Sequence, residues 1–329
     1  MSLPKISIIT PSFNQGKFLE ETIQSVISQD YPNLEYIVID GGSADNSVEV
    51  IKKYESHLHF WTSEKDRGQS HAINKGFQKA SGEIISWLNS DDLYLKDALV
   101  NAAGVFKKNP EAALIHGKTI LFGNKKKETE KGAEDFDLQL RYFSMMPYAQ
   151  PSSFFRRKVL DEQGLLDETL HFGMDYDLLI RIALNYKIEK TELLFSKYRL
   201  HEESKTMSQL EDFAVDWAKI FSKFLRTIDK EKKWIKLLES INFYREGNDT
   251  YRASRVFEEK EMKIIFLYFL EYQLHIYYDM LDFPVANKII MLMKDIDKSF
   301  FKERNLGAID RRVKNLNPFI VRFLRKISR

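Results

Sequence analysis

The sequence of 329 residues contains no cysteine. Disulfide bridges and thiolate metal ligands are therefore excluded, and any bound metal has to be held by carboxylate, imidazole or carbonyl groups. No run of about 18 uncharged apolar residues occurs, so we expect no membrane-spanning helix. The opening residues MSLPKISIIT lack the long apolar run of a secretory signal peptide. These absences make a cytoplasmic location the default expectation.

Two glycine-rich nucleotide-binding motifs are also missing. No G-x-G-x-x-G follows the first predicted strand, and no G-x-x-x-x-G-K-[ST] occurs anywhere in the chain. The sequence therefore disfavours dinucleotide-dependent dehydrogenases and P-loop enzymes.

An excess of basic charge is absent from most of the chain. The formal net charge is +2, but residues 301–329 alone carry nine Lys or Arg and two Asp or Glu, which leaves −5 for the other 300 residues. Nucleic-acid-binding proteins concentrate basic residues on their binding face, so we expect no nucleic-acid partner. Apolar residues make up 43% and charged residues 30%, which is typical of a soluble globular protein.

The first third of the sequence alternates short β-branched runs with amphipathic runs. This pattern predicts strands at 6–10, 34–39, 60–62 and 84–88, helices at 17–29, 47–54 and 96–108, and a loop running into a helix at 68–79. Repeated strand–helix–strand units build a mostly parallel sheet with helices on both faces. The predicted fold class is therefore α/β, with a Rossmann-like sheet.

The pattern changes near residue 205. Beyond it no glycine-rich strand ends remain, and long helical runs dominate at 213–225, 232–244, 260–279 and 285–296. We therefore predict two domains, an α/β domain at residues 1–205 and an all-helical region at residues 206–329.

Three polar segments follow predicted strands: PSFN at 11–14, DGGS at 40–43 and NSDD at 89–92. Ligands bind at the carboxyl ends of the strands in open α/β sheets, so we predict that the three segments converge on one site. The paired carboxylates suit Mg²⁺ or Mn²⁺ shared with substrate phosphates. Each segment has a plainer interpretation on its own: DGGS is a strand-to-helix turn, and Asp91 or Asp92 caps the turn that follows.

Taken together and in order, these segments resemble family 2 glycosyltransferases of the GT-A fold, of the bacterial polysaccharide type. The resemblance covers residues 4–206 and rests on SIITPSFNQGKFLEETIQSVISQDYPNLEYIVIDGGSADNS, SEKDRGQSHAINKGFQKASGEIISWLNSDD, HFGMDYDLLIRIA and YRLHEESKT. It implies a metal-dependent, inverting transfer of a sugar from a nucleotide-diphosphate sugar (a UDP- or dTDP-sugar). The implied acceptor is a hydroxyl of a saccharide or lipid-linked saccharide, in cell-surface polysaccharide or glycolipid synthesis.

The resemblance also implies site residues, and Asp91 and Asp92 match the family's D-x-D-type motif. It implies that Asp92 and His201 hold the metal, Mn²⁺ or Mg²⁺, and that Asp175 is the general base. Asp91 would contact the ribose or the sugar, and Asp40 the base of the nucleotide. The other implied donor-binding residues are Pro11, Phe13, Asn14, Arg67, Gly68, Gln69 and Asn74.

Elementary chemistry fits these roles and leaves alternatives open. A divalent cation offsets the charge on a leaving diphosphate, and a carboxylate has to take the proton of the acceptor hydroxyl. Asp175 lies at a predicted helix start, which suits either an ionised base or a purely structural first-turn residue. His201 either ligates the metal, contacts the diphosphate, or is a surface residue. Met174 stands where the family often has an acid, and His71 where it often has an aspartate.

Two rival functions are weaker. A catalytically inactive nucleotide-sugar-binding or scaffolding protein would not need the intact set of Asp40, Asp91, Asp92 and Asp175. A nucleotidyltransferase also uses a carboxylate-bound metal on an α/β sheet, but it usually has a glycine-rich basic loop where PSFN stands here.

The end of the chain predicts a basic amphipathic helix that starts at Asn317–Pro318. Its apolar face would carry Phe319, Ile320, Phe323, Leu324 and Ile327, and its basic face Arg322, Arg325, Lys326 and Arg329. Such a helix either makes peripheral contact with the inner face of the cell membrane, or packs on the helical region or on a second subunit of a homodimer.

Overall fold

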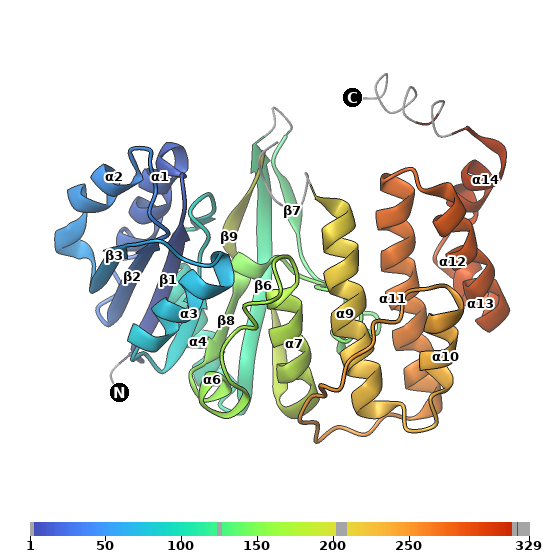
Figure 1. Cartoon of the computed structure of the whole chain (residues 1–329). Helices are drawn as coiled ribbons and strands as arrows, with labels where there is room; N and C mark the ends of the chain where they lie inside the picture. The colour runs from blue at the N-terminus through green and yellow to red at the C-terminus, as the bar shows by residue number, and fades with distance from the viewer. Residues whose placement is uncertain (1–2, 124–126, 202–208, 318–320, 322–329) are drawn as a thin grey trace. The chain divides into compact units, whose positions relative to one another are not determined.

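The structure is a computed structural model, and it describes residues 3–123, 127–201, 209–317 and 321. The chain divides into two compact units (Figure 1). The first comprises Met1–Leu138 and Met146–Met207, and the second Gln139–Met145 and Ser208–Arg329. The domain boundary predicted after residue 205 falls among residues 202–208, outside the described ones, and stays a prediction.

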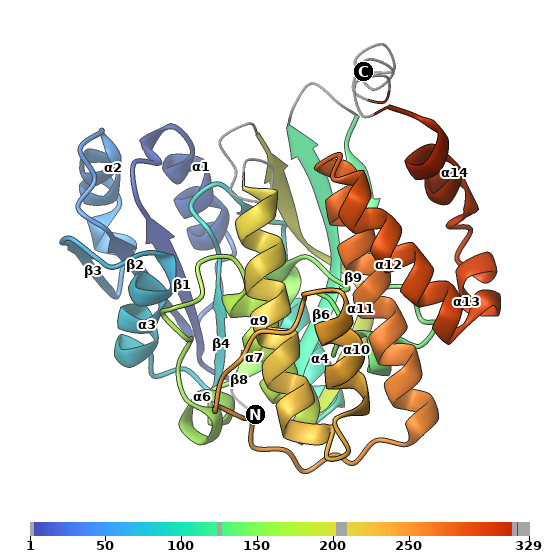
Figure 2. The same cartoon turned by 45° about the vertical axis from the view of Figure 1, so that its right-hand side comes forward.

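The first unit is built on one sheet, which Figures 1 and 2 show from two sides. Its strands are β1 (Ile6–Ser12), β2 (Leu34–Asp40), β3 (Phe60–Ser63), β4 (Ile84–Trp87), β5 (Leu93–Tyr94), β6 (Ala112–Gly123), β7 (Thr129–Lys131), β8 (Ser153–Arg156) and β9 (Lys187–Leu200). Their order is β3-β2-β1-β4-β8-β6-β9-β5, with β7 paired to β6. The first four strands are parallel, β8 is antiparallel to β4 and β6, and β9 is parallel to β6. The predicted α/β class is confirmed.

Helices cover both faces of the parallel half, as predicted. They are α1 (Gly16–Ile27), α2 (Ser47–Lys53), α3 (Gln69–Lys79) and α4 (Ala98–Lys108). The next helices, α6 (Lys158–Gln163) and α7 (Met174–Asn185), pack beside β8 and β9 instead. Residues of α1, α2 and α4 share one core with Ile6 and Ile8 of β1. On the other face α3 packs so closely that a Cβ at Gly76 would lie 2.4 Å from Ile9. Burial on both faces explains why these strands are continuous apolar runs.

The described part of the second unit is helical. The short α5 (Leu138–Arg141) starts at the boundary, and the rest comprises α9 (Leu210–Ile228), α10 (Lys233–Ser240), α11 (Glu259–Asp279), α12 (Phe283–Ile296), α13 (Lys298–Glu303) and α14 (Gly307–Asn315). Aromatic packing joins the longest helices, since Phe221 of α9 stacks on Phe269 of α11 with ring centroids 3.8 Å apart. The predicted helical C-terminal region is thus confirmed.

Two expectations concern membranes. Over the ranges that the structure describes, no helix is both long and apolar enough to cross one. The predicted basic amphipathic helix lies outside the described residues except for Asn317 and Val321, and it stays a prediction from the sequence.

Candidate functional site

The three polar segments meet at the carboxyl-end edge of the parallel strands. The N–H of Gly41, after β2, donates to the carbonyl of Ser12 in β1 (2.8 Å), and the N–H of Asn14 donates to Ser43 Oγ (2.7 Å). Thr22 of α1 donates to the carbonyl of Asp92, 2.9 Å away. The loop after β1 is thereby tied to the loop after β2, and α1 to the acidic loop after β4.

Asp40, the last residue of β2, is fully buried. Its carboxylate accepts hydrogen bonds from the N–H groups of Gly42 (3.1 Å) and Ser43 (2.9 Å) and from the hydroxyls of Ser43 (2.5 Å) and Ser63 (2.7 Å). These bonds shape the DGGS turn and join it to β3. A nucleotide base that donates to Asp40 would share a carboxylate that already accepts these four hydrogen bonds, and that predicted role stays a prediction.

Asp66 is a polar residue of this edge that the sequence did not single out. Its Oδ1 accepts from the N–H of Gly68 (2.9 Å), and its Oδ2 would lie 2.6 Å from a Cβ at Gly41. The ring of Phe13, which is 59% exposed, would lie 3.2 Å from the same Cβ. Glycine is therefore needed at position 41 because Phe13 and Asp66 approach it from two sides. The available sequence signal was an acidic residue two positions before Gly68, whose φ is +119°.

Four predicted donor-pocket residues lie just before α3 or within it: Arg67, Gly68, Gln69 and Asn74. Arg67, 71% exposed at its side chain, donates from Nε and Nη2 to Glu168 Oε2 (3.2 and 2.6 Å). Asn74 is buried and donates from Nδ2 to the carbonyl of Leu166 and to Glu168 Oε1. Gln69 Nε2 donates to Asn89 Oδ1 beside the acidic pair (2.8 Å). Arg67 and Asn74 thus hold a neighbouring loop, whereas Gln69 reaches the NSDD segment.

The acidic pair is held asymmetrically. Asp92 is 1% exposed, and its Oδ1 accepts from the N–H of Arg199 (2.9 Å). Burial raises the pKa of Asp92 well above its ordinary value, and the charge of Asp91 raises it further, against the opposing effect of the Arg199 hydrogen bond. Asp91 keeps 22% of its side chain exposed, and its Oδ2 lies 2.9 Å from His201 Nε2. The structure therefore brings His201 to Asp91.

These residues fit a hard divalent cation only with help from a substrate. In the described ranges no cluster of three or more His, Asp or Glu forms a ready metal site. Asp91 and His201 supply a carboxylate and an imidazole, and His201 Nδ1 is a buried nitrogen without a hydrogen-bond partner among the described residues. Mg²⁺ and related ions commonly use one or two carboxylates and take other ligands from phosphates and water. With Asp92 adjacent, the donor set suits a cation that arrives with a diphosphate.

Asp175 is the second residue of α7. Its Oδ1 accepts from the N–H of Tyr176 (2.8 Å), and its side chain stays partly accessible to solvent. Burial nevertheless raises the pKa of Asp175 to about 6, against the effect of these backbone hydrogen bonds. A carboxyl group with this pKa is well matched to proton transfer near neutral pH.

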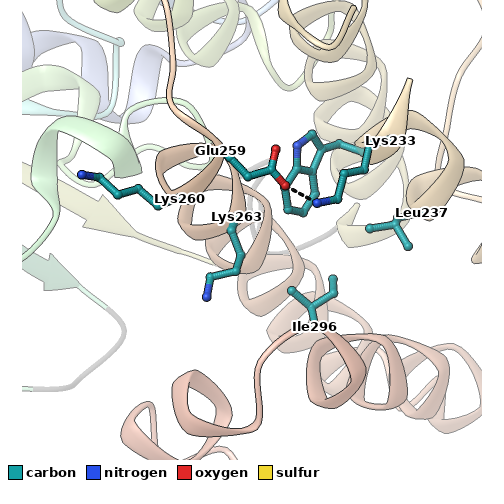
Figure 3. A pocket seen from close by; sticks show the side chains of 7 residues that line it. Lys233, Leu237, Glu259, Lys260, Lys263 and Ile296 are labelled. Carbon is teal, nitrogen blue, oxygen red and sulfur yellow. Dashed lines mark hydrogen bonds and ion pairs between the residues drawn. The ribbon is translucent and has the colours of Figure 1, made fainter. Parts of the chain in front are cut away.

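A cavity of about 480 Å³ in the second unit is a different kind of feature (Figure 3). It is lined by Lys233, Trp234, Leu237, Glu259, Lys260, Lys263 and Ile296. Each lysine is ion-paired with a carboxylate, Lys233 with Glu259, Lys260 with Glu258 and Lys263 with Asp297. None of the residues predicted from the sequence lines this cavity, and its paired charges give it no evident role in the chemistry.

Known proteins resemble this chain in sequence. The profile of glycosyl transferase family 2 matches residues 7–164. An uncharacterized glycosyltransferase of Mycobacterium tuberculosis is 32% identical over 56% of this chain and 70% of its own length. An uncharacterized glycosyltransferase of Rickettsia felis is 28% identical over 70% of this chain, which spans only 39% of that relative's length.

Solved structures resemble the fold. Staphylococcus aureus TarS 1–349 in complex with UDP-GlcNAc has a TM-score of 0.56 and 16% identity over 91% of this chain and 92% of its own. The mannosyltransferase PcManGT of Pyrobaculum calidifontis, in complex with GDP-Man and Mn²⁺, has a TM-score of 0.57 and 15% identity over 99% of this chain and 80% of its own. With the sequence match and the GT-A-like sheet in agreement, the chain belongs to glycosyl transferase family 2 and is a glycosyltransferase.

Proposed function

We propose that this glycosyltransferase transfers a sugar from a UDP- or dTDP-sugar to a hydroxyl of a saccharide or lipid-linked saccharide, with inversion and with Mn²⁺ or Mg²⁺, in bacterial cell-surface polysaccharide or glycolipid synthesis. The observation that carries the proposal is the meeting of the loops after β1, β2 and β4 at one edge, with Asp91 against His201. The fold neighbours bound to UDP-GlcNAc, and to GDP-Man with Mn²⁺, support the donor class and the metal.

The proposed roles follow from what each side chain offers. The exposed ring of Phe13 would lie along the nucleotide with Pro11 and Asn14, and the carboxylates of Asp40 and Asp66 would accept hydrogen bonds from the base. Gly68 has a φ of +119°, which glycine adopts readily because it has no Cβ. The missing side chain would also let the backbone approach the donor closely.

The acidic loop would hold the diphosphate end of the donor. Asp92 and His201 would bind the cation, and Asp91 would either share it or contact the ribose or sugar. When bound, a divalent cation offsets the negative charge on the leaving diphosphate. Arg67, Gln69 and Asn74 would keep the start of α3 in place beside the donor.

Asp175 would act as the general base. A carboxylate within reach of the acceptor hydroxyl takes its proton as the hydroxyl oxygen attacks the anomeric carbon, and inversion follows from attack on the face opposite the leaving group. Its raised pKa makes Asp175 a stronger base than an ordinary aspartate while leaving it mostly ionised at pH 7.

A thermal-shift panel of UDP, dTDP and GDP with and without Mn²⁺ tests the proposal. A nucleotide at about 100 times its Kd stabilises a protein by about 2.7 kcal/mol, which we expect to raise the Tm of a chain of this length by roughly 4 °C. We expect UDP or dTDP to do so only with Mn²⁺. No metal-dependent shift with any of the three nucleotides would contradict the proposal.

Two variants sharpen this experiment. Asp92→Asn should lose the metal-dependent shift because the buried amide cannot offer a charged ligand. Asp30→Asn is the matched control, since Asp30 is an exposed carboxylate whose φ of +46° asparagine tolerates well. Release of UDP from a UDP-sugar then separates transfer from inactive binding, and release of pyrophosphate from UTP would instead indicate a nucleotidyltransferase.

A further inference from the structure

Arg199, the residue before the last of β9, lies directly behind the acidic pair. Its side chain is only 14% exposed although it is charged. We propose that Arg199 is a positioning residue that orients Asp91 and Asp92 and thereby sets the affinity of the site for its divalent cation. The inference rests on the proposed function, because it concerns the same site.

Arg199 is hydrogen-bonded to both acidic residues. Its backbone N–H donates to Asp92 Oδ1, and its side-chain Nε donates to the main-chain carbonyl of Asp91, each at 2.9 Å. That carbonyl belongs to the peptide group joining the two aspartates, so the guanidinium fixes the plane of the peptide from which both carboxylates diverge. A substitution of the side chain removes the second bond and leaves the first in place.

The guanidinium is itself held in one plane. Its central carbon lies 4.7 Å from the ring centroid of Phe18 in α1 and 4.4 Å from that of Phe122 in β6. Its Nη2 is ion-paired with Glu21, also in α1. A planar guanidinium can stack between two rings and still donate from its edge, whereas a lysine ammonium is a single point of charge that cannot. The arrangement thus uses a property specific to arginine.

The same stretch of chain also supplies His201. Two residues beyond Arg199, His201 approaches Asp91 Oδ2 (2.9 Å), and its ring lies 5.0 Å from that of Phe18. The carbonyl of Asp91 is therefore fixed by Arg199 and its carboxylate by His201. Arg199 and His201, at and just beyond the end of β9, thus hold the two carboxylates close together despite their repulsion. A cation needs this arrangement of its ligands.

The test measures Mn²⁺ binding directly. Free Mn²⁺ is quantified by electron paramagnetic resonance during titration into the full chain with UDP present, for wild type, Arg199→Lys and Arg199→Met. Residues that orient metal ligands typically change metal affinity about 10–100-fold when substituted. We expect both variants to bind Mn²⁺ at least about 10-fold more weakly, with the retained charge of lysine giving no rescue.

Lys197→Met is the matched control. Lys197 lies two residues earlier on β9, its Nζ is 5.2 Å from the ring centroid of Phe122, and it is ion-paired with Glu128. Lys197 therefore resembles Arg199 in lying beside the ring of Phe122 and in forming an ion pair with a glutamate. Its described contacts do not include Asp91 or Asp92. We expect its Mn²⁺ affinity to equal that of wild type. A similar weakening in Lys197→Met would overturn the inference, because loss of any cation beside Phe122 would then explain the effect.

The remaining outcomes separate this inference from the proposed function. Wild-type Mn²⁺ affinity in Arg199→Lys overturns the positioning role alone. A wild-type chain that binds no Mn²⁺ with UDP, and none when dTDP replaces UDP, contradicts the proposed function and the inference together. Melting curves without metal show whether a variant is folded. Weaker Mn²⁺ binding by an Arg199→Lys chain that melts within about 2 °C of wild type supports the positioning role.

Discussion

At the scale of single residues, Asp175 combines two properties that usually oppose each other. It lies in the first turn of α7, where backbone N–H groups favour a carboxylate, yet burial dominates and raises its pKa to about 6. A group whose folded pKa is raised above its unfolded value binds protons more readily when folded. The ionised form therefore costs stability at pH 7, which is the expected signature of a residue retained for chemistry.

We predict that transfer activity rises with pH and reaches half of its plateau near pH 6. Below this pH Asp175 is protonated and cannot accept the proton of the acceptor, whereas above it the carboxylate is available. Asp175→Asn should lose at least about 100-fold in turnover, in line with loss of a general base, and should bind UDP as wild type does. The measurement is turnover from pH 5 to 8 with UDP binding as the control; normal transfer by Asp175→Asn would show that another group is the base.

The same substitution has a consequence for stability. Because the folded pKa of Asp175 is raised, the native state binds more protons than the unfolded chain between about pH 4 and pH 6, and stability falls as pH rises through this window. Asp175→Asn should remove that loss and stabilise the chain at pH 7 by about 1–2 kcal/mol, since partial exposure reduces the full linkage value. Urea denaturation at pH 4 and pH 7 checks this: the gain should be seen at pH 7 and be absent at pH 4.

The sequence predicted the types of the site residues better than their connections. Asp40, Asp91 and Asp92 were expected at strand ends, and the structure places them there. The sequence could not show that the oxygens of Asp40 are already occupied by Ser43 and Ser63. Such pairings join residues that are distant in the chain or compete for one carboxylate, and only the folded geometry decides between them.

At the scale of elements, hydrogen bonds join the start of α3 to the segment before α7. Glu168 accepts from Arg67 and Asn74, the amide of Asn74 also bonds both main-chain groups of Leu166, and Ser70 donates to the carbonyl of Leu170. Burial alone would raise the pKa of Glu168, but the hydrogen bonds from Asn74 and Arg67 hold it below its ordinary value. The loop at the carboxyl end of β3 is thereby linked to the segment that leads to Asp175.

We predict that Glu168→Gln lowers turnover about 10-fold while UDP affinity changes little. A misplacement of about 1 Å can cost a factor of about 100 in rate, and loss of the Arg67 ion pair loosens the segment that leads to Asp175, the proposed base. Glu64→Gln is the control, because Glu64 forms an ion pair with Lys75 of α3 but does not link α3 to the segment before α7. Steady-state turnover and UDP binding decide the matter: equal losses in both variants would show a general surface-charge effect.

Local patterns predicted the parallel half of the sheet well. The strands at Ile6, Leu34, Phe60 and Ile84 begin at the predicted residues because each opens a β-branched or aromatic run, and three of the four runs are buried while β3 is only half-buried. The order of β8, β6 and β9 was beyond the sequence, since those strands pair over long separations with mixed direction. Residues 139–145 are a further example: Ser144 donates to the carbonyl of Ile265, which places the segment in the helical unit.

At the scale of the whole molecule, the family match covers only the N-terminal half of the chain. The family profile ends at residue 164, so it covers the loops that carry Asp40, Asp91 and Asp92 but neither Asp175 nor His201. The helical unit lies entirely outside it except for residues 139–145. The family match therefore includes the loops proposed to bind the donor and excludes the proposed base and most of the helical unit.

The charge distribution of the whole chain leads to the last prediction. The body is slightly acidic, and residues 301–329 carry a net +7, with Arg322, Arg325, Lys326 and Arg329 on one face of the predicted terminal helix. Each basic residue near an anionic membrane contributes about 1 kcal/mol, and the attraction is screened by salt. We expect the full chain to float with vesicles containing phosphatidylserine at low salt, and a chain ending at Asn315 to stay in solution. Replacing the four basic residues by glutamine, with the apolar face intact, is the matched control and should also abolish flotation. Equal flotation of all three chains would exclude the membrane role and leave packing on the helical unit or on a second subunit, which the mass of the particle in solution would then distinguish.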